Sequence, residues 1–154
     1  MKQHFGDVQL VNANTLKEDI VPNDDSIVAE QTSSNLVEEI DEYFSSTRIQ
    51  RESMYSQMLE TYQKMVDSTE ISNEQKAIAI QEINNITKTK NAIMIAENLI
   101  KNKNFQDVVI LVSNNTASVV VKAGTLTAEQ IAQIQNIVCR ELSISSENIN
   151  ISNK

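Results

Sequence analysis

The chain has 154 residues, of which 40% are hydrophobic, and its formal net charge at pH 7 is −8. That length and apolar fraction suit one domain with a modest core, and the negative charge argues against non-specific binding to nucleic acid or to an anionic membrane. The single cysteine, Cys139, excludes an intramolecular disulfide framework and any metal cluster built on cysteine. We expect Cys139 to be a small core residue.

The first part of the chain, residues 1–33, has no sustained hydrophobic period and contains Pro22 and the pair Asp24–Asp25. Such a composition is typical of a solvated linker or a poorly ordered arm. The only histidine, His4, lies in this segment, so we expect it to have no metal-binding or catalytic role. We therefore predict a flexible tether over residues 1–33 and a folded domain over residues 34–152.

Two long helices are predicted next. Apolar residues recur every three or four positions over a stretch that begins near Ser33–Ser34 and ends near Val66. A second helix is predicted from Ser72, where Ser-Asn-Glu-Gln is a capping-box pattern, to about Asn102, and a break near Asn84–Asn85 remains open. Because only a few residues separate the two helices, we expect them to pack as an antiparallel pair.

A β-hairpin is predicted after the helices. Two runs rich in β-branched residues, 106–113 and 116–122, flank Asn114–Asn115, and asparagine tolerates the positive φ angles of a tight turn. A third helix should follow, because Thr127 and Gln130 form a capping box, and Leu126 can pack on the start of the apolar stripe. That stripe consists of Ile131, Ile134, Ile137, Val138 and Leu142. The alternation over 148–151 predicts a last short strand.

The fold class is therefore α+β, with two long helices followed by a β-β-α-β core around a three-stranded sheet. A crossover through the third helix leaves the third strand parallel to the second if these two are neighbours. If it joins the other side of the first strand, the order is 2-1-3 and all neighbours are antiparallel. The continuous apolar run Val108–Val112 favours that second order, with the first strand at the centre. Both faces of this strand are apolar, so one face needs cover from the first helix, a second copy or a partner.

The sequence contains no pattern that points to catalysis. Gly6 and Gly124 stand alone, so no glycine-rich phosphate loop exists, and one histidine in the predicted tether cannot complete a catalytic triad. Acidic pairs such as Glu38–Glu39 are expected to be solvated helix faces. We expect no enzymatic activity, no cofactor and no metal site.

Several segments resemble the C-terminal domain of the stage III sporulation protein AH family. They are Phe-Gln-Asp-Val-Val-Ile at 105–110, Ala-Ser-Val-Val-Val-Lys-Ala at 117–123, the Leu-Thr-x-Glu-Gln helix at 126–141 and Glu-Asn-Ile-x-Ile at 147–151. Upstream, Tyr43-Phe-Ser-Ser-Thr-Arg48-x-x-Arg51 is similar to a segment of that family's first long helix. The resemblance covers residues 40–151. The turn at 142–147 departs from it, because the family's glycine and prolines are missing there.

The resemblance implies a non-enzymatic ectodomain of an endospore-forming bacterium. Its N-terminal anchor, absent from this chain, would lie in the mother-cell membrane, and its domain would face the intermembrane space. There it would bind the forespore membrane protein stage II sporulation protein Q and bridge the two membranes in an engulfment complex. The family's domain is similar to the ring-building modules of type III secretion systems, which implies a homo-oligomeric ring and a secretion-like channel.

Two modes of partner binding remain open at this point. In the first, the strand Thr116–Lys122 is an exposed edge that a partner strand extends. In the second, which we favour, the partner docks on a mixed surface of the sheet and the first helix, since arginine and tyrosine suit interface centres. This predicted surface consists of Arg51, Tyr55, Val109, Leu111, Val120 and Lys122.

Three other classes of protein remain to be weighed. A self-associating helical assembly domain, unrelated to sporulation, is the main alternative, because long methionine-rich helices also form coiled coils. An RNA-binding module with a KH-like sheet should show a basic face and a Gly-x-x-Gly clamp, and neither is present. A hydrolase would need the acidic pairs to converge in a pocket.

Overall fold

The computed structural model describes the backbone of residues 4–154 and the side chains of residues 31–154. It contains two compact units, Met1–Asp41 and Glu42–Lys154, and the second holds the sheet. The side chain of His4 lies outside the described residues, so the expectation for it remains a prediction. The domain boundary at 33/34 and the flexible tether remain predictions.

Helix α1 (His4–Asp67) begins far earlier than the sequence predicted. The expected start near Ser33–Ser34 is therefore wrong. The prediction relied on hydrophobic periodicity, which reports a packing face and not the helical backbone itself. Residues 4–33 contain only one glycine and one proline, Gly6 and Pro22. The other residues of this segment are compatible with a helix even though they form no apolar packing face.

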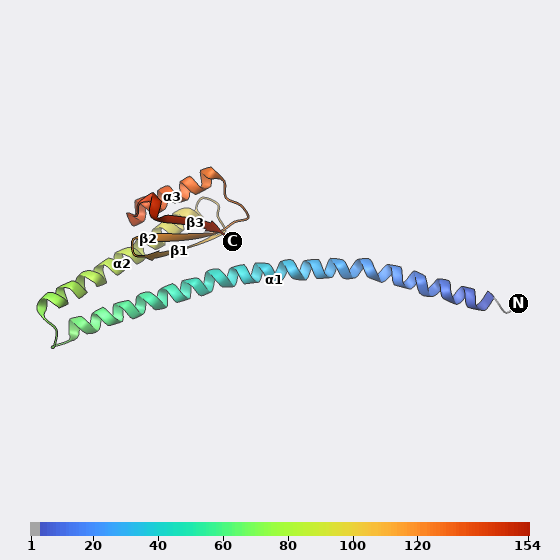
Figure 1. The fold of residues 1–154 in the computed structure, drawn as a ribbon, viewed down its shortest axis with the longest axis horizontal. Helices are drawn as coiled ribbons and strands as arrows, with labels where there is room; N and C mark the ends of the chain where they lie inside the picture. The colour runs from blue at the N-terminus through green and yellow to red at the C-terminus, as the bar shows by residue number, and fades with distance from the viewer. Residues whose placement is uncertain (1–3) are drawn as a thin grey trace. The chain divides into compact units, whose positions relative to one another are not determined.

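Helix α2 (Asn73–Lys101) follows a short connection and is unbroken (Figure 1). The hydroxyl of Ser72 accepts a hydrogen bond from the backbone N–H of Gln75 at 3.3 Å, which confirms the predicted N-cap. The chain reverses direction between the two helices (Figure 1), and Arg51 and Glu52 of α1 form ion pairs with Glu97 and Lys90 of α2, the latter pair at 2.9 Å. The predicted antiparallel pairing is thus confirmed within Glu42–Lys154.

The sheet consists of β1 (Asp107–Ser113), β2 (Thr116–Lys122) and β3 (Ile149–Asn153), in the order β1-β2-β3. The strands β1 and β2 are antiparallel, whereas β2 and β3 are parallel. The predicted order 2-1-3 is therefore wrong, and Thr116–Lys122 is the central strand and not an edge. The connection through α3 places β3 next to β2 and parallel to it.

The local predictions for the hairpin and for α3 (Ala128–Leu142) are confirmed. Asn114 and Asn115 have φ angles of 49° and 61°, as their turn requires. At the start of α3, the Thr127 hydroxyl accepts from the Gln130 N–H at 3.2 Å, and the Gln130 side chain accepts from the Thr127 N–H at 2.9 Å. Both halves of the predicted capping box are therefore present.

One face of the sheet packs against α2 and α3 in the main hydrophobic core. The β1 residues Val108 and Ile110 and the β2 residues Val119 and Val121 lie on this face, with the predicted α3 stripe opposite them. One member of that stripe, Ile131 in the first turn of α3, is 40% exposed. The other members are buried or packed against the core.

The turn after α3, where the family's glycine is missing, is formed by a residue in an unfavourable backbone conformation. Ser143 caps α3 in the left-handed region, with φ 55° and ψ 38°. The next residue, Ile144, is buried, so the chain must turn at Ser143 to place it. The short helix η1 (Ser146–Asn148) then leads into β3.

We expect Ser143→Gly to raise the free energy of unfolding by about 0.5–1 kcal/mol, because glycine adopts positive φ without the steric cost of a Cβ. Urea denaturation of both proteins measures the change. The matched control is Ser145→Gly, at φ −63° and ψ 145°, where glycine relieves no strain. Equal effects of the two substitutions would show that Ser143 carries no backbone strain.

Candidate protein-interaction site

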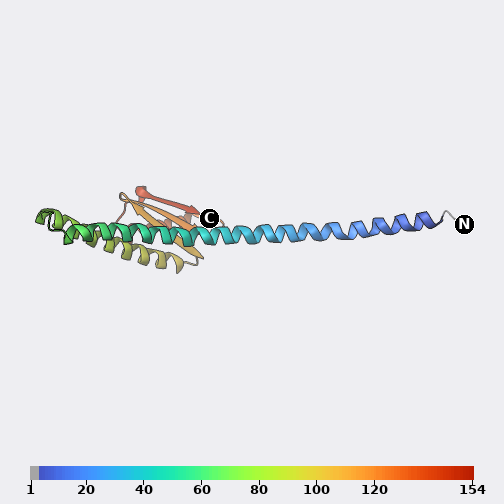
Figure 2. The same ribbon diagram turned by 90° about the horizontal axis from the view of Figure 1, so that it is seen from below.

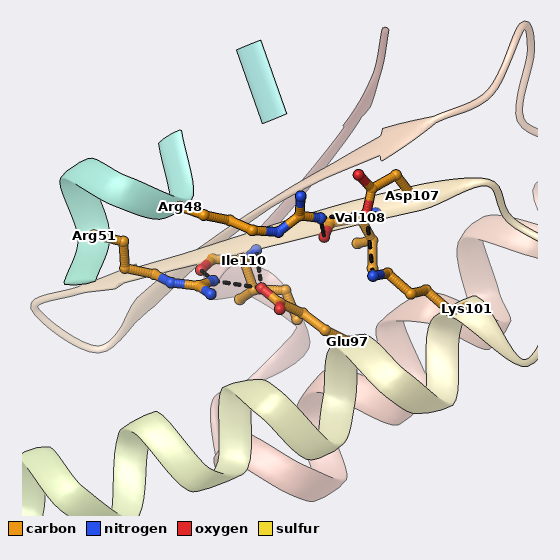
Figure 3. A network of polar contacts seen from close by, with 7 residues as sticks. All are labelled: Arg48, Arg51, Glu97, Lys101, Asp107, Val108 and Ile110. Carbon is orange, nitrogen blue, oxygen red and sulfur yellow. Dashed lines mark hydrogen bonds and ion pairs between the residues drawn. The ribbon is translucent and has the colours of Figure 1, made fainter. Parts of the chain in front are cut away.

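The outward edge of β1 is bonded to side chains of the two long helices (Figure 3). In an antiparallel pair, alternate residues direct both backbone groups away from the neighbouring strand. In β1 two of these residues are Val108 and Ile110. Arg48 donates to the carbonyl of Val108 at 3.1 Å, and Arg51 donates to the carbonyl of Ile110 at 2.8 Å. The N–H of Ile110 donates to Glu97 at 3.0 Å, so α1 and α2 both contribute to this edge.

Arg51 and Glu97 also form an ion pair with each other, and it is almost fully buried. Their side chains are only 9% and 11% exposed. Moving two charges out of water is costly, and the pair is tolerated only where further hydrogen bonds satisfy both groups. Each partner has such a bond to the backbone of Ile110. The pair therefore fixes α1, α2 and β1 to one another at one point.

A second, more exposed cluster lies at the beginning of β1. Asp107 is bonded to Arg48 and lies 3.3 Å from the ammonium of Lys101, and it accepts from the Val108 N–H at 2.9 Å. Burial raises the pKa of Asp107, but the hydrogen bonds from Arg48 and Val108 and the charge of Arg48 outweigh it. The pKa therefore lies below its ordinary value of 3.8. Because the folded-state pKa is depressed, Asp107 contributes stability above pH 3.8, and this is lost as the pH falls through the lower folded value.

The face of the sheet away from the main core is covered by α1 over part of its area. Val109 on this face is 0% exposed, and its neighbour across the strands, Val120, is buried as well. Phe44 and Thr47, on the α1 stretch that carries Arg48 and Arg51, are also buried. Both views place this stretch of α1 on the side of the strands opposite α3 (Figure 2). Of the three covers considered for this face, the first helix is the one that the structure shows.

The predicted partner-binding residues fall into three environments. Arg51 holds the edge of β1, and Tyr55 lies in the main core with only 4% of its surface exposed. Burial raises the pKa of Tyr55, and its hydroxyl makes no hydrogen bond within the described residues. The remaining four share the second sheet face, as strand alternation predicted: Val109, Leu111, Val120 and Lys122.

Exposure divides these four residues. Val109 and Val120 are buried, whereas Leu111 and Lys122 are partly exposed. By register, Leu111 lies in a row across the strands with Ser118 of β2 and Asn150 of β3. This row crosses the second face from β1 to β3, the strand at the other edge of the sheet. That any of these residues contacts a partner remains a prediction.

The other edge of the sheet is β3, which the sequence analysis placed at an edge but beside β1 and not beside β2. The N–H of Lys154 donates to Val121 at 3.0 Å, and the carbonyl of Lys154 accepts from Ala123 at 3.1 Å. In a parallel pair, residues that alternate with Lys154 direct their backbone groups away from β2. These are Ile151 and Asn153, on the outer side of β3. A position of β3 parallel to β2 was one of the two orders that the sequence allowed, and the apolar run of β1 favoured the other.

Over residues 31–154, no three His, Cys, Asp or Glu side chains are grouped so that they could bind a metal ion. Cys139 is partly buried and packs against the main core. Of the helices formed by described residues, none combines the length and apolar character that crossing a membrane requires.

We expect Glu97→Ala to lower the free energy of unfolding by about 3–5 kcal/mol, because it leaves Arg51 buried without a counter-charge. The Ile110 N–H also loses its acceptor. The matched control is Glu60→Ala, which removes an exposed pair with Lys64 and should change the same quantity by less than about 0.5 kcal/mol. Urea denaturation gives both values. A Glu97→Ala effect as small as that of the control would contradict the role assigned to the buried pair.

Comparisons with known proteins identify the family. The family model described as SpoIIIAH-like protein matches residues 4–151. A chain from the structure of the SpoIIQ-SpoIIIAH pore forming complex aligns with a TM-score of 0.67 and 16% sequence identity, over 73% of this chain and 96% of that one. At this identity the alignment shows a shared fold. No curated protein sequence matches. Because the family model matches residues 4–151, from the start of α1 into β3, this chain belongs to the SpoIIIAH-like protein family.

Proposed function

We propose that this chain is a non-enzymatic adaptor that binds stage II sporulation protein Q during sporulation of an endospore-forming bacterium. The observation that carries the proposal is family membership over residues 4–151. It is supported by the shared fold with a chain from a SpoIIQ-SpoIIIAH complex. Of the six predicted surface positions, Leu111 and Lys122, together with the β3 edge, supply the candidate contacts.

In this proposal the domain lies between the mother-cell and forespore membranes. An N-terminal anchor would hold the protein in the mother-cell membrane, and residues 1–33 would span the distance to the folded domain. Binding of stage II sporulation protein Q would then bridge the two membranes during engulfment. Copies of the domain would also contribute to a secretion-like channel ring. The resemblance to the family is the support for these finer statements.

The proposed docking surface combines the outer edge of β3 with the partly exposed row that contains Leu111. Lys122 lies on the same face, near the end of β3. A partner strand added to β3 would gain main-chain hydrogen bonds, and side chains of the row would supply specificity. The buried residues Arg51, Tyr55, Val109 and Val120 would act on this surface indirectly, because they hold α1 and the sheet together.

We expect this chain to bind the purified soluble domain of stage II sporulation protein Q from the same source in a saturable, one-to-one manner. Isothermal titration calorimetry measures the affinity. Asn153→Pro removes an outward N–H from β3 and should weaken binding by about tenfold, the equivalent of roughly 1.4 kcal/mol. Asn153→Ala is the matched control, since it removes the same side chain and keeps the N–H.

The outcomes separate the function from its site. If the titration gives no heat, and the two proteins do not elute together from a size-exclusion column, the proposed function is contradicted. Binding that is equally strong for both Asn153 variants would leave the function intact and contradict docking through the β3 edge.

A self-associating helical assembly is the second candidate function. It is favoured by exposed apolar side chains on the long helices, namely Ile49, Ile78 and Met94. Such an assembly would show concentration-dependent oligomers in sedimentation without stage II sporulation protein Q. This behaviour, together with absent binding in the titration, would favour it over the adaptor.

A further inference from the structure

We propose that the side chains on β1 form an edge cap that closes this strand to pairing with a second copy of the chain. The edge cap consists of Arg48, Arg51, Glu97 and Asp107. It directs any extension of the sheet to β3. The inference concerns the chain alone and does not depend on the proposed function.

An uncapped β1 would be a strong template for self-association. Its sequence is Asp-Val-Val-Ile-Leu-Val-Ser, without glycine or proline, and its one charged residue is at the start. Edge strands that are long, apolar and unprotected pair readily with other strands. β1 is an edge strand of this sheet, so it needs a protecting device.

The edge cap satisfies every outward backbone group of two successive outward residues. The N–H and carbonyl of Val108 are bonded to Asp107 and Arg48, and those of Ile110 to Glu97 and Arg51. An incoming strand would have to displace charge-assisted hydrogen bonds, which are stronger than the neutral bonds that it would form. It would also separate the buried Arg51–Glu97 pair and leave both charges unpaired. Strand addition at this edge is therefore unfavourable.

The protection depends on α1, because two of the four capping side chains come from that helix. Arg48 and Arg51 lie one helical turn apart and reach successive outward carbonyls of β1 (Figure 3). Charged side chains over an edge and cover by a helix are two recognised ways of preventing strand pairing, and here the same residues provide both. Release of α1 from the sheet would open the β1 edge.

The test compares self-association of the wild-type chain with that of Arg51→Ala/Glu97→Ala. Removing both members of the pair avoids a lone buried charge, and it exposes both backbone groups of Ile110. We expect the variant to self-associate at least about tenfold more tightly than the wild type in sedimentation equilibrium. The Ile110 amide should exchange with solvent faster in the dilute variant and become protected on association. The matched control, Glu60→Ala/Lys64→Ala, removes an exposed pair and should behave as the wild type does.

Each outcome decides the proposal. Tighter association with protection of Ile110 supports the edge cap. A folded double variant that associates no more tightly than the wild type, or that associates without protection of β1, overturns it. If circular dichroism shows that the double variant is unfolded, the variant Arg48→Ala tests the proposal instead. The ion pair that it removes, between Arg48 and Asp107, is partly exposed, so the fold should survive. This variant opens the Val108 carbonyl, and unchanged self-association of its folded form would overturn the proposal.

Discussion

The buried ion pair between Arg51 and Glu97 is the interaction on which the arrangement of α1, α2 and β1 depends. Both charges bond to the backbone of one residue, Ile110, so the pair fixes two helices to one point of the sheet. Two weaker contacts also hold α1 in place. The ammonium of Lys154 lies over the ring of Tyr43, and Lys90 of α2 forms an ion pair with Glu52. Because α1 is held there, the apolar second face around Val109 is buried within the chain.

This constraint makes the two edges of the sheet different. One edge, β1, is bonded to charged side chains, while β3 directs the outer backbone groups of Ile151 and Asn153 away from its neighbour. Such a sheet suits a domain that binds a partner strand but must not pair with its own copies. One edge strand is blocked by side chains, and the other has outward-directed backbone groups for the partner. This asymmetry fits the role proposed for this member of the SpoIIIAH-like family, which is to join one specific partner.

The sequence predicted those features that depend on neighbours along the chain. The capping box of Thr127 and Gln130, the Ser72 cap and the turn at Asn114–Asn115 need only a few adjacent residues, and all are confirmed. Strand alternation likewise placed Val109 and Val120 on one face. These local rules, with the α+β order of elements, gave the fold class.

The sequence did not predict features that depend on distant contacts. An apolar strand fits both a central position and an edge covered by a helix, and the apolar run of β1 therefore led to the wrong prediction of a central position. Arg51 was interpreted as an exposed interface residue, because its partner Glu97 lies 46 residues away and no local pattern joins them. The burial of Val120 likewise follows from the packing of α1, which periodicity alone does not reveal.

The most direct test of the account is amide hydrogen exchange of the wild-type chain, measured residue by residue. The closed edge of β1 predicts that the Ile110 amide exchanges as slowly as amides of the central strand β2, and that the Ile151 amide on β3 exchanges much faster. Exchange of Ile110 as fast as that of Ile151 would show that β1 is an open edge. That result would contradict both the edge cap and the asymmetry of the sheet.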